Sequence, residues 1–209
     1  MLIKIHPDNP SPRQIKRVVE TLENGGIIIY PTDSVYALGC SLLHPKSIEK
    51  LARIKQINPE KAMFSFIFSN LTHLSNYTKP IDNTIFKLIK KTTPGPFTFI
   101  LEANNRMPKI VKGRKKTVGI RIPDNNIALA IVEELGHPLI TSSVHDEDDI
   151  IEYMTDPEMM YEKYQYDIDL LVDGGYGDNR ASTVIDCTDG RITLLRQGKG
   201  NIDDYVYTE

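Results

Sequence analysis

The feature that most constrains the fold of this chain is the alternation of short apolar runs with amphipathic helical segments. Residues 27–29 are three isoleucines, and Pro31 ends this run. A short apolar run bounded by turn residues is typical of a buried strand. The helical segments instead carry apolar residues at three- and four-residue spacing; one begins at Ser11 and another follows Pro45. This alternation predicts an α/β fold.

The same patterns predict the remaining elements. Further strands are expected at residues 2–5, 64–68, 97–101, 117–122 and 139–141, and further helices around residues 85–89 and 127–135. Near the end of the chain, two strand-like segments flank Asp189–Gly190, a pair that favours a tight antiparallel hairpin. We therefore expect one domain over residues 1–209, built on a mixed open sheet with flanking helices.

Polar side chains gather where the predicted strands end. Thr32, Asp33 and Ser34 directly follow the isoleucine strand, at the type of sheet edge where α/β proteins bind ligands. Other strand ends supply further hydroxyls and cations: Thr117, Thr141, Ser142, Ser143, Ser182, Thr183, Lys55, Lys61, Arg121 and Arg196. Taken singly, such a hydroxyl is more often a turn former or strand-end cap than a ligand group, but their recurrence predicts a polar cleft.

Several function classes are disfavoured by the sequence. A net charge of −3 neither attracts nucleic acid nor excludes it, so any basic binding surface must be local. Neither common phosphate-binding glycine motif occurs, and the nucleophile motif Gly-x-Ser-x-Gly is missing. The two cysteines, Cys40 and Cys187, lie far apart, which favours structural thiols and predicts no protein-bound metal. No apolar run reaches the length of a membrane span and no leader pattern is visible, so we expect a cytoplasmic protein.

Charge is nevertheless segregated along the chain. Residues 106–116 contain six lysines and arginines and no acidic residue. This basic segment is either a solvated loop or a surface that binds phosphate or RNA. Residues 146–158 are acidic, and we interpret them as a solvated loop, with a divalent-cation site that includes His145 as the alternative.

Five separated motifs resemble the YrdC-like family. They are YPTDSVYALG at 30–39, TPGPFTFIL at 93–101, TVGIRIP at 117–123, PLITS at 138–142 and STVID at 182–186, in the order that the family shows. The segment IHPDNP at 5–10 and the sequence of residues 33–40 are most similar to the YciO branch of this family. The resemblance covers nearly the whole chain.

This resemblance implies a twisted sheet around a concave, positively charged cleft that binds nucleotides and double-stranded RNA. It also implies the synthesis of threonylcarbamoyl-AMP and pyrophosphate from L-threonine, bicarbonate and ATP, with Mg²⁺ accompanying ATP. That product serves the threonylcarbamoyladenosine modification of tRNA. The alternatives are a YciO-type protein that binds RNA or nucleotide without synthase activity, and a small-molecule sensor without RNA.

The resemblance also assigns roles to residues. For L-threonine it implies Thr32, Ser34, Arg121 and Ser182, and for catalysis it implies Lys55 and Lys61 at the phosphates. For the nucleotide it implies Lys55, Lys61, Thr117, Thr141, Ser142 and Arg196. For RNA we expect Lys112, Arg114, Lys115 and Lys116, called here the basic quartet. The chain differs from the synthases at Ile57, where they usually carry arginine, and at Val144, where they usually carry asparagine.

Overall fold

A computed structural model describes residues 1–58, 64–105, 116–145 and 153–205. The five α-helices within these ranges are α1 (Pro12–Glu23), α2 (Pro45–Ile54), α3 (Asn83–Thr92), α5 (Asn126–Leu135) and α6 (Pro157–Tyr164). The strands are β1 (Leu2–Lys4), β2 (Ile27–Tyr30), β3 (Ala37–Ser41), β4 (Ser65–Ile67), β5 (Phe97–Glu102), β6 (Thr117–Arg121), β7 (Leu139–Ser143), β8 (Leu170–Asp173), β9 (Thr183–Asp186) and β10 (Thr193–Arg196).

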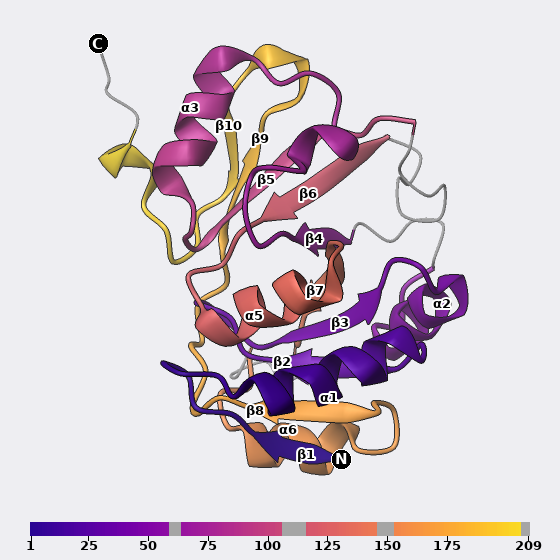
Figure 1. Cartoon of the computed structure of the whole chain (residues 1–209). Helices are drawn as coiled ribbons and strands as arrows, with labels where there is room; N and C mark the ends of the chain where they lie inside the picture. Colours follow the sequence, from indigo (N-terminus) through magenta and orange to yellow (C-terminus); the bar gives the residue numbers. More distant parts are fainter. Residues whose placement is uncertain (59–63, 106–115, 146–152, 206–209) are drawn as a thin grey trace.

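All ten strands belong to one open sheet, in the order β1-β8-β2-β3-β7-β4-β6-β5-β9-β10. Parallel pairs such as β5 with β9 stand beside antiparallel pairs such as β9 with β10, so the predicted mixed sheet is confirmed. The sheet is strongly twisted, and the arrows of β3 and β6 point in very different directions (Figure 1). This twist brings the loop after β2 toward the end of β6.

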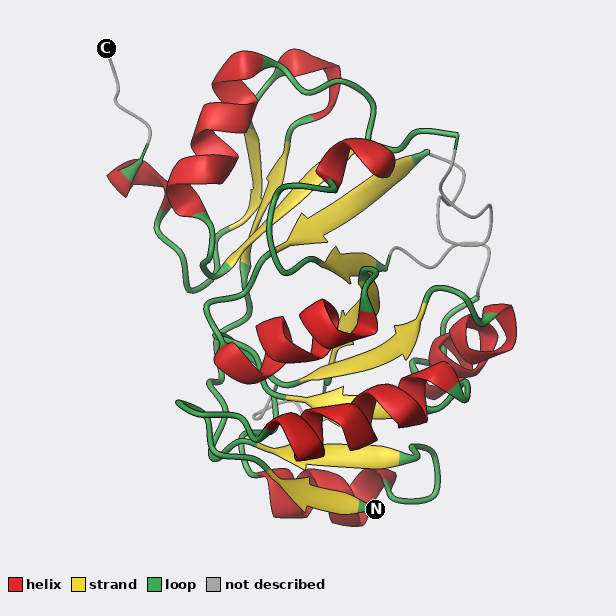
Figure 2. Cartoon of the chain, in the orientation of Figure 1, coloured by secondary structure: helices red, strands yellow, loops and turns green. Residues whose placement is uncertain are grey.

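Helices cover both faces of the sheet in its first half (Figure 2). The side chains of β2 show this most clearly, because Ile28 packs with α1 and α5 while Ile27 and Ile29 belong to the core that includes α2. Both α1 and α2 begin with Pro in their first turn, where its missing N–H costs nothing. The helix α5 is capped by Asn125, the residue before it, whose side chain accepts a 3.0 Å hydrogen bond from the Ala128 N–H.

In the second half, one face of the sheet carries polar groups. On β6, Val118 and Ile120 pack into the core that includes α3, so Gly119 and Arg121 point to the opposite face. A Cβ atom at Gly119 would stand 2.5 Å from Ser65 Oγ, so a larger residue would force the Ser65 side chain to move. Arg121 therefore ends a strand whose polar face is free to line a site.

Within the described ranges, no helix is long and apolar enough to cross a membrane.

Candidate functional site

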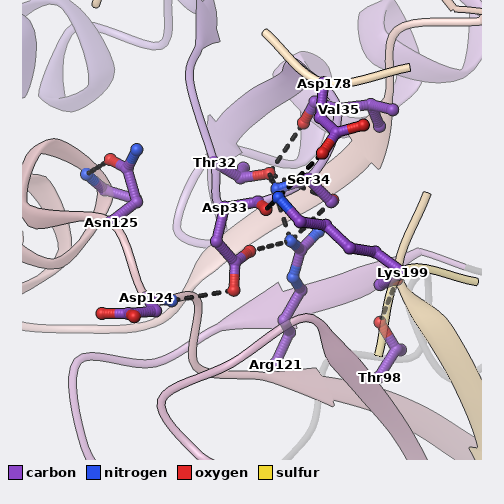
Figure 3. Close-up of polar contacts among 12 residues, drawn as sticks. Thr32, Asp33, Ser34, Val35, Thr98, Arg121, Asp124, Asn125, Asp178 and Lys199 are labelled. Atoms are coloured by element: carbon purple, nitrogen blue, oxygen red, sulfur yellow. Dashed lines mark hydrogen bonds and ion pairs between the residues drawn. The ribbon is translucent and has the colours of Figure 1, made fainter. Parts of the chain in front are cut away.

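The loop between β2 and β3 forms one wall of the candidate site (Figure 3). Thr32 Oγ1 accepts a 3.1 Å hydrogen bond from the Ser34 N–H and donates a 2.7 Å hydrogen bond to the Val35 carbonyl. These bonds hold the loop in a tight turn in which the backbone bends around the threonine hydroxyl. The side chains of Asp33 and Ser34 consequently point toward the end of β6.

Arg121 is the centre of the site. Its Nη2 atom donates to Ser34 Oγ at 2.8 Å, to Thr32 Oγ1 at 3.1 Å and to Asp33 Oδ1. The other carboxylate oxygen of Asp33 accepts a 2.9 Å hydrogen bond from the Asp124 N–H. Both side chains of the Arg121–Asp33 ion pair are only 8% exposed. The structure thus brings together Thr32, Ser34 and Arg121, three of the residues predicted to bind L-threonine, and adds Asp33 as the counter-charge of Arg121.

One polar atom of Arg121 is unsatisfied. Its Nε atom is buried and has no hydrogen-bond partner in the part of the chain that the structure describes. A buried donor without an acceptor costs about 1–3 kcal/mol, and more when the group is charged. Native structures rarely leave such a group unpaired, so Nε is open to an acceptor that the described part of the chain does not supply, either a water or a ligand atom.

Ser182, the fourth residue predicted to bind L-threonine, directly precedes β9. The register that pairs Phe99 with Ile120 puts Thr98 beside Arg121. Thr98 Oγ1 and Ser182 Oγ lie 2.9 Å apart and share a hydrogen bond. Arg196 reaches the Ser182 carbonyl with Nη2 at 2.8 Å, so its guanidinium supports the backbone beside the site.

The residues predicted to bind the nucleotide lie farther apart from one another. Lys55 donates a 2.9 Å hydrogen bond to the Ser143 carbonyl at the end of β7, and burial lowers the pKa of its ammonium group. The hydroxyl of Thr141 is 2.7 Å from the Tyr30 hydroxyl, on the face that carries Arg121. Strand alternation turns Ser142 to the opposite face, so Thr141 and Ser142 do not present their side chains to one ligand.

Thr117 begins β6, whereas Arg121 ends it. Four steps along the strand separate their Cα atoms by about 13 Å. The two side chains point to the same face, so together they fit only a long ligand.

Some predicted residues lie outside the described ranges. They are Lys61 and three members of the basic quartet: Lys112, Arg114 and Lys115. Lys116 is described and exposed. The positively charged cleft implied by the resemblance stays a prediction.

The acidic segment falls mostly outside the described ranges as well. Asp156 is described, and it caps α6 by accepting a 2.8 Å hydrogen bond from the Glu158 N–H. Among the described residues, no three His, Cys, Asp or Glu side chains gather as metal ligands.

The two positions that differ from the synthases have different environments. Ile57 is 39% exposed just after α2, so an apolar side chain lies in water there. Val144 is buried in the core, and its N–H donates a 2.9 Å hydrogen bond to the Tyr36 carbonyl. Val144 therefore serves packing, whereas nothing in the structure explains Ile57.

The sequence reasoning missed four residues of the site. Asp33 stood inside a quoted motif but received no role, and Thr98 stood in another. Asp178 and Lys199 were not considered, although Figure 3 shows them beside Ser34. The glycines around Asp178 and Lys199 were the available signal, because glycine often marks a close approach of two backbones.

Comparisons with known proteins agree with these motifs. Residues 20–198 match the Sua5/YciO/YrdC family, which carries the description "Telomere recombination". The chain is 38% identical to the Escherichia coli (strain K12) protein YciO over 204 residues, which is 97% of each chain. The crystal structure of E. coli YciO matches with a TM-score of 0.90 and covers 99% of both chains at 37% identity.

Two further proteins widen the comparison. The chain is 30% identical over 184 residues to a threonylcarbamoyl-AMP synthase from Coxiella burnetii (strain RSA 493 / Nine Mile phase I), covering 88% of this chain and 97% of that one. P. abyssi Sua5, solved in complex with L-threonine, shares the fold, with a TM-score of 0.85 at 24% identity, over 95% of this chain and 57% of that one.

Proposed function

Because the chain belongs to the Sua5/YciO/YrdC family, we propose that it is an L-threonylcarbamoyladenylate synthase. The 30% sequence identity to a threonylcarbamoyl-AMP synthase, over most of both chains, supports this choice. The reaction joins L-threonine, bicarbonate and MgATP into threonylcarbamoyl-AMP, and releases pyrophosphate and water.

The observation that carries the proposal is the buried guanidinium of Arg121 with its unpaired Nε atom. A planar fork of N–H donors suits a carboxylate, and a threonine carboxylate would supply the missing acceptor. Ser34 Oγ contacts the guanidinium, and the strand register puts Thr98, which hydrogen-bonds Ser182, beside Arg121; these hydroxyls suit the polar side chain of threonine.

The charge balance of the site favours an amino acid over a simple anion. Asp33 already neutralises Arg121, and the two charges are shielded from water. A zwitterion brings one charge of each sign and keeps this balance. A ligand with only a carboxylate adds an uncompensated negative charge in a site of low dielectric, which is costly.

The chemistry needs no nucleophile from the protein. The threonine ammonium group first loses a proton to solvent, and the free amine then forms a carbamate with bicarbonate as water leaves. A carbamate oxygen then attacks the α-phosphorus of ATP, and the bond to pyrophosphate breaks. The protein contributes position and charge: Arg121 holds the carboxylate, while Lys55 and Lys61 neutralise the phosphates and the leaving group.

A product assay tests this function. The purified chain is incubated with MgATP, bicarbonate and labelled L-threonine, and pyrophosphate and labelled adenylate are measured. We expect pyrophosphate release that depends on threonine, and at least a hundredfold loss in Lys55→Met, because a cation at the phosphates is removed. Lys50→Met, on the surface of α2, is the control. Threonine binding without any labelled adenylate would refute the synthase and leave a binding protein.

A further inference from the structure

The chain that follows β10 lies directly against the site. The Gly198 N–H donates a 2.9 Å hydrogen bond to Thr183 Oγ1, and the Lys199 N–H donates a 2.8 Å hydrogen bond to the Ala181 carbonyl. A Cβ atom at Gly198 would stand 2.3 Å from the Ala181 carbonyl oxygen, so only glycine allows this approach. The backbone of Lys199 is therefore fixed beside Ser182, a residue predicted to bind L-threonine.

From this fixed position, the Lys199 side chain reaches across the site (Figure 3). Its ammonium group donates a 2.7 Å hydrogen bond to the Asp33 carbonyl and pairs with Asp178 Oδ2 at 2.8 Å. The Asp178 N–H in turn donates a 3.2 Å hydrogen bond to the Ser34 carbonyl. One ammonium group thus connects the C-terminal segment, the loop after β8 and the turn that carries Ser34.

The ionisation of Asp178 agrees with this arrangement. Burial opposes the charged carboxylate, but the hydrogen bond from Lys199, the Arg180 N–H and the charge of Lys199 outweigh burial and lower the pKa of Asp178. Asp178 is consequently charged at neutral pH, and the bridge persists under assay conditions.

We propose that Lys199 is a positioning residue that holds the Asp33–Ser34 backbone against Arg121 and so preorganises the pocket. Its effect on threonine rests on the proposed function, whereas its effect on the turn does not. Arg121 and Asp124 fix Asp33 through its side chain, and Lys199 fixes it through its carbonyl. Without the ammonium group, the Asp33 carbonyl loses its hydrogen bond to the segment that follows β10.

The global stability of the protein is expected to change little. The Lys199 and Asp178 side chains are 40% and 29% exposed, and ion pairs at such sites contribute little to folding. This separates a positioning role from a merely structural one. Lys50 offers a matched control, because it pairs with Asp169 at 3.2 Å with exposures of 38% and 46%, on the surface of α2.

The test compares Lys199→Met with Lys50→Met. Amide hydrogen exchange of residues 32–36 is measured without ligand, and L-threonine affinity is measured by calorimetry. In Lys199→Met, we expect exchange at 32–36 to accelerate about fivefold or more, because local opening becomes easier. We also expect threonine to bind about tenfold more weakly, with an unchanged unfolding midpoint. Lys199→Arg should keep most of the slow exchange at residues 32–36 and most of the L-threonine affinity.

Hydrogen exchange and L-threonine affinity distinguish a failure of the proposed function from a failure of the role proposed for Lys199. If the wild type binds no threonine, the proposed function fails, but the exchange rates still decide the role of Lys199. Equal exchange at 32–36 in the two methionine variants would overturn the proposal. A fall of the unfolding midpoint with uniformly faster exchange would also overturn it, because Lys199 would then be structural.

Discussion

Breaking the buried ion pair between Arg121 and Asp33 should destabilise the protein strongly. Both side chains are 8% exposed, so neither charge can turn to bulk water when its partner is removed. Removing one partner of such a pair costs about 3–5 kcal/mol. For a domain of this size, this lowers the unfolding midpoint by roughly 6–20 °C. Asp33→Asn and Arg121→Met should each lower the free energy of unfolding by this amount, as measured by urea unfolding followed by circular dichroism.

The double variant sharpens this prediction. Replacing both residues leaves no unpaired charge, so the double variant should lose clearly less than the sum of the two single losses. Lys79→Met is the control, because the Lys79–Glu102 pair is 56% and 43% exposed and should be worth below about 1 kcal/mol. Single losses below about 1 kcal/mol, or strictly additive losses, would refute the reasoning.

Three further outcomes are expected. Burial raises the pKa of the Cys40 and Cys187 thiols to about 12, so neither should react with a thiol reagent at pH 8 until urea unfolds the protein; fast labelling of the native protein would contradict this. Asn125→Ala should lower the free energy of unfolding by about 1 kcal/mol, because α5 loses its N-cap; an unchanged midpoint in urea would count against that cap. Replacing the basic quartet with alanine should weaken duplex RNA binding and reduce its salt dependence, and an unchanged slope of log K against log salt would remove this segment from the interface.

Most elements of the fold follow from local sequence patterns. The helices at α1, α2, α3 and α5 were predicted from apolar spacing, and the strands at β2, β5 and β6 from continuous or alternating apolar residues. The hairpin of β9 and β10 around Asp189–Gly190 is confirmed as antiparallel. These elements carry strong local signals because one turn residue or one apolar face defines each.

Three elements were missed for physical reasons. The strand β3 has the sequence ALGCS, with few β-branched or aromatic residues, and becomes a strand because β2 and β7 pair with it on both sides. The strand β8 has the sequence LLVD, and a run of three apolar residues does not by itself distinguish a strand from a buried turn of helix. The short helix α6 lies close to the acidic segment, which drew the interpretation toward a loop.

The site itself was predicted in part. Motifs identified Ser34 and Arg121, but their contact joins residues 87 positions apart and depends on the twist of the sheet. No local pattern reveals that Asp33 pairs with Arg121, or that Lys199 returns to the same turn from the other end of the chain. Such contacts are set by tertiary packing.

The most direct test of the central claim is calorimetric titration of L-threonine into the wild type, Arg121→Lys and the control Arg53→Lys. Arg121→Lys keeps the positive charge but loses the planar fork and the Nε donor. We predict saturable binding to the wild type and to the control, and binding at least about tenfold weaker in Arg121→Lys. No binding to the wild type, or equal affinity in all three proteins, would contradict a threonine pocket centred on Arg121.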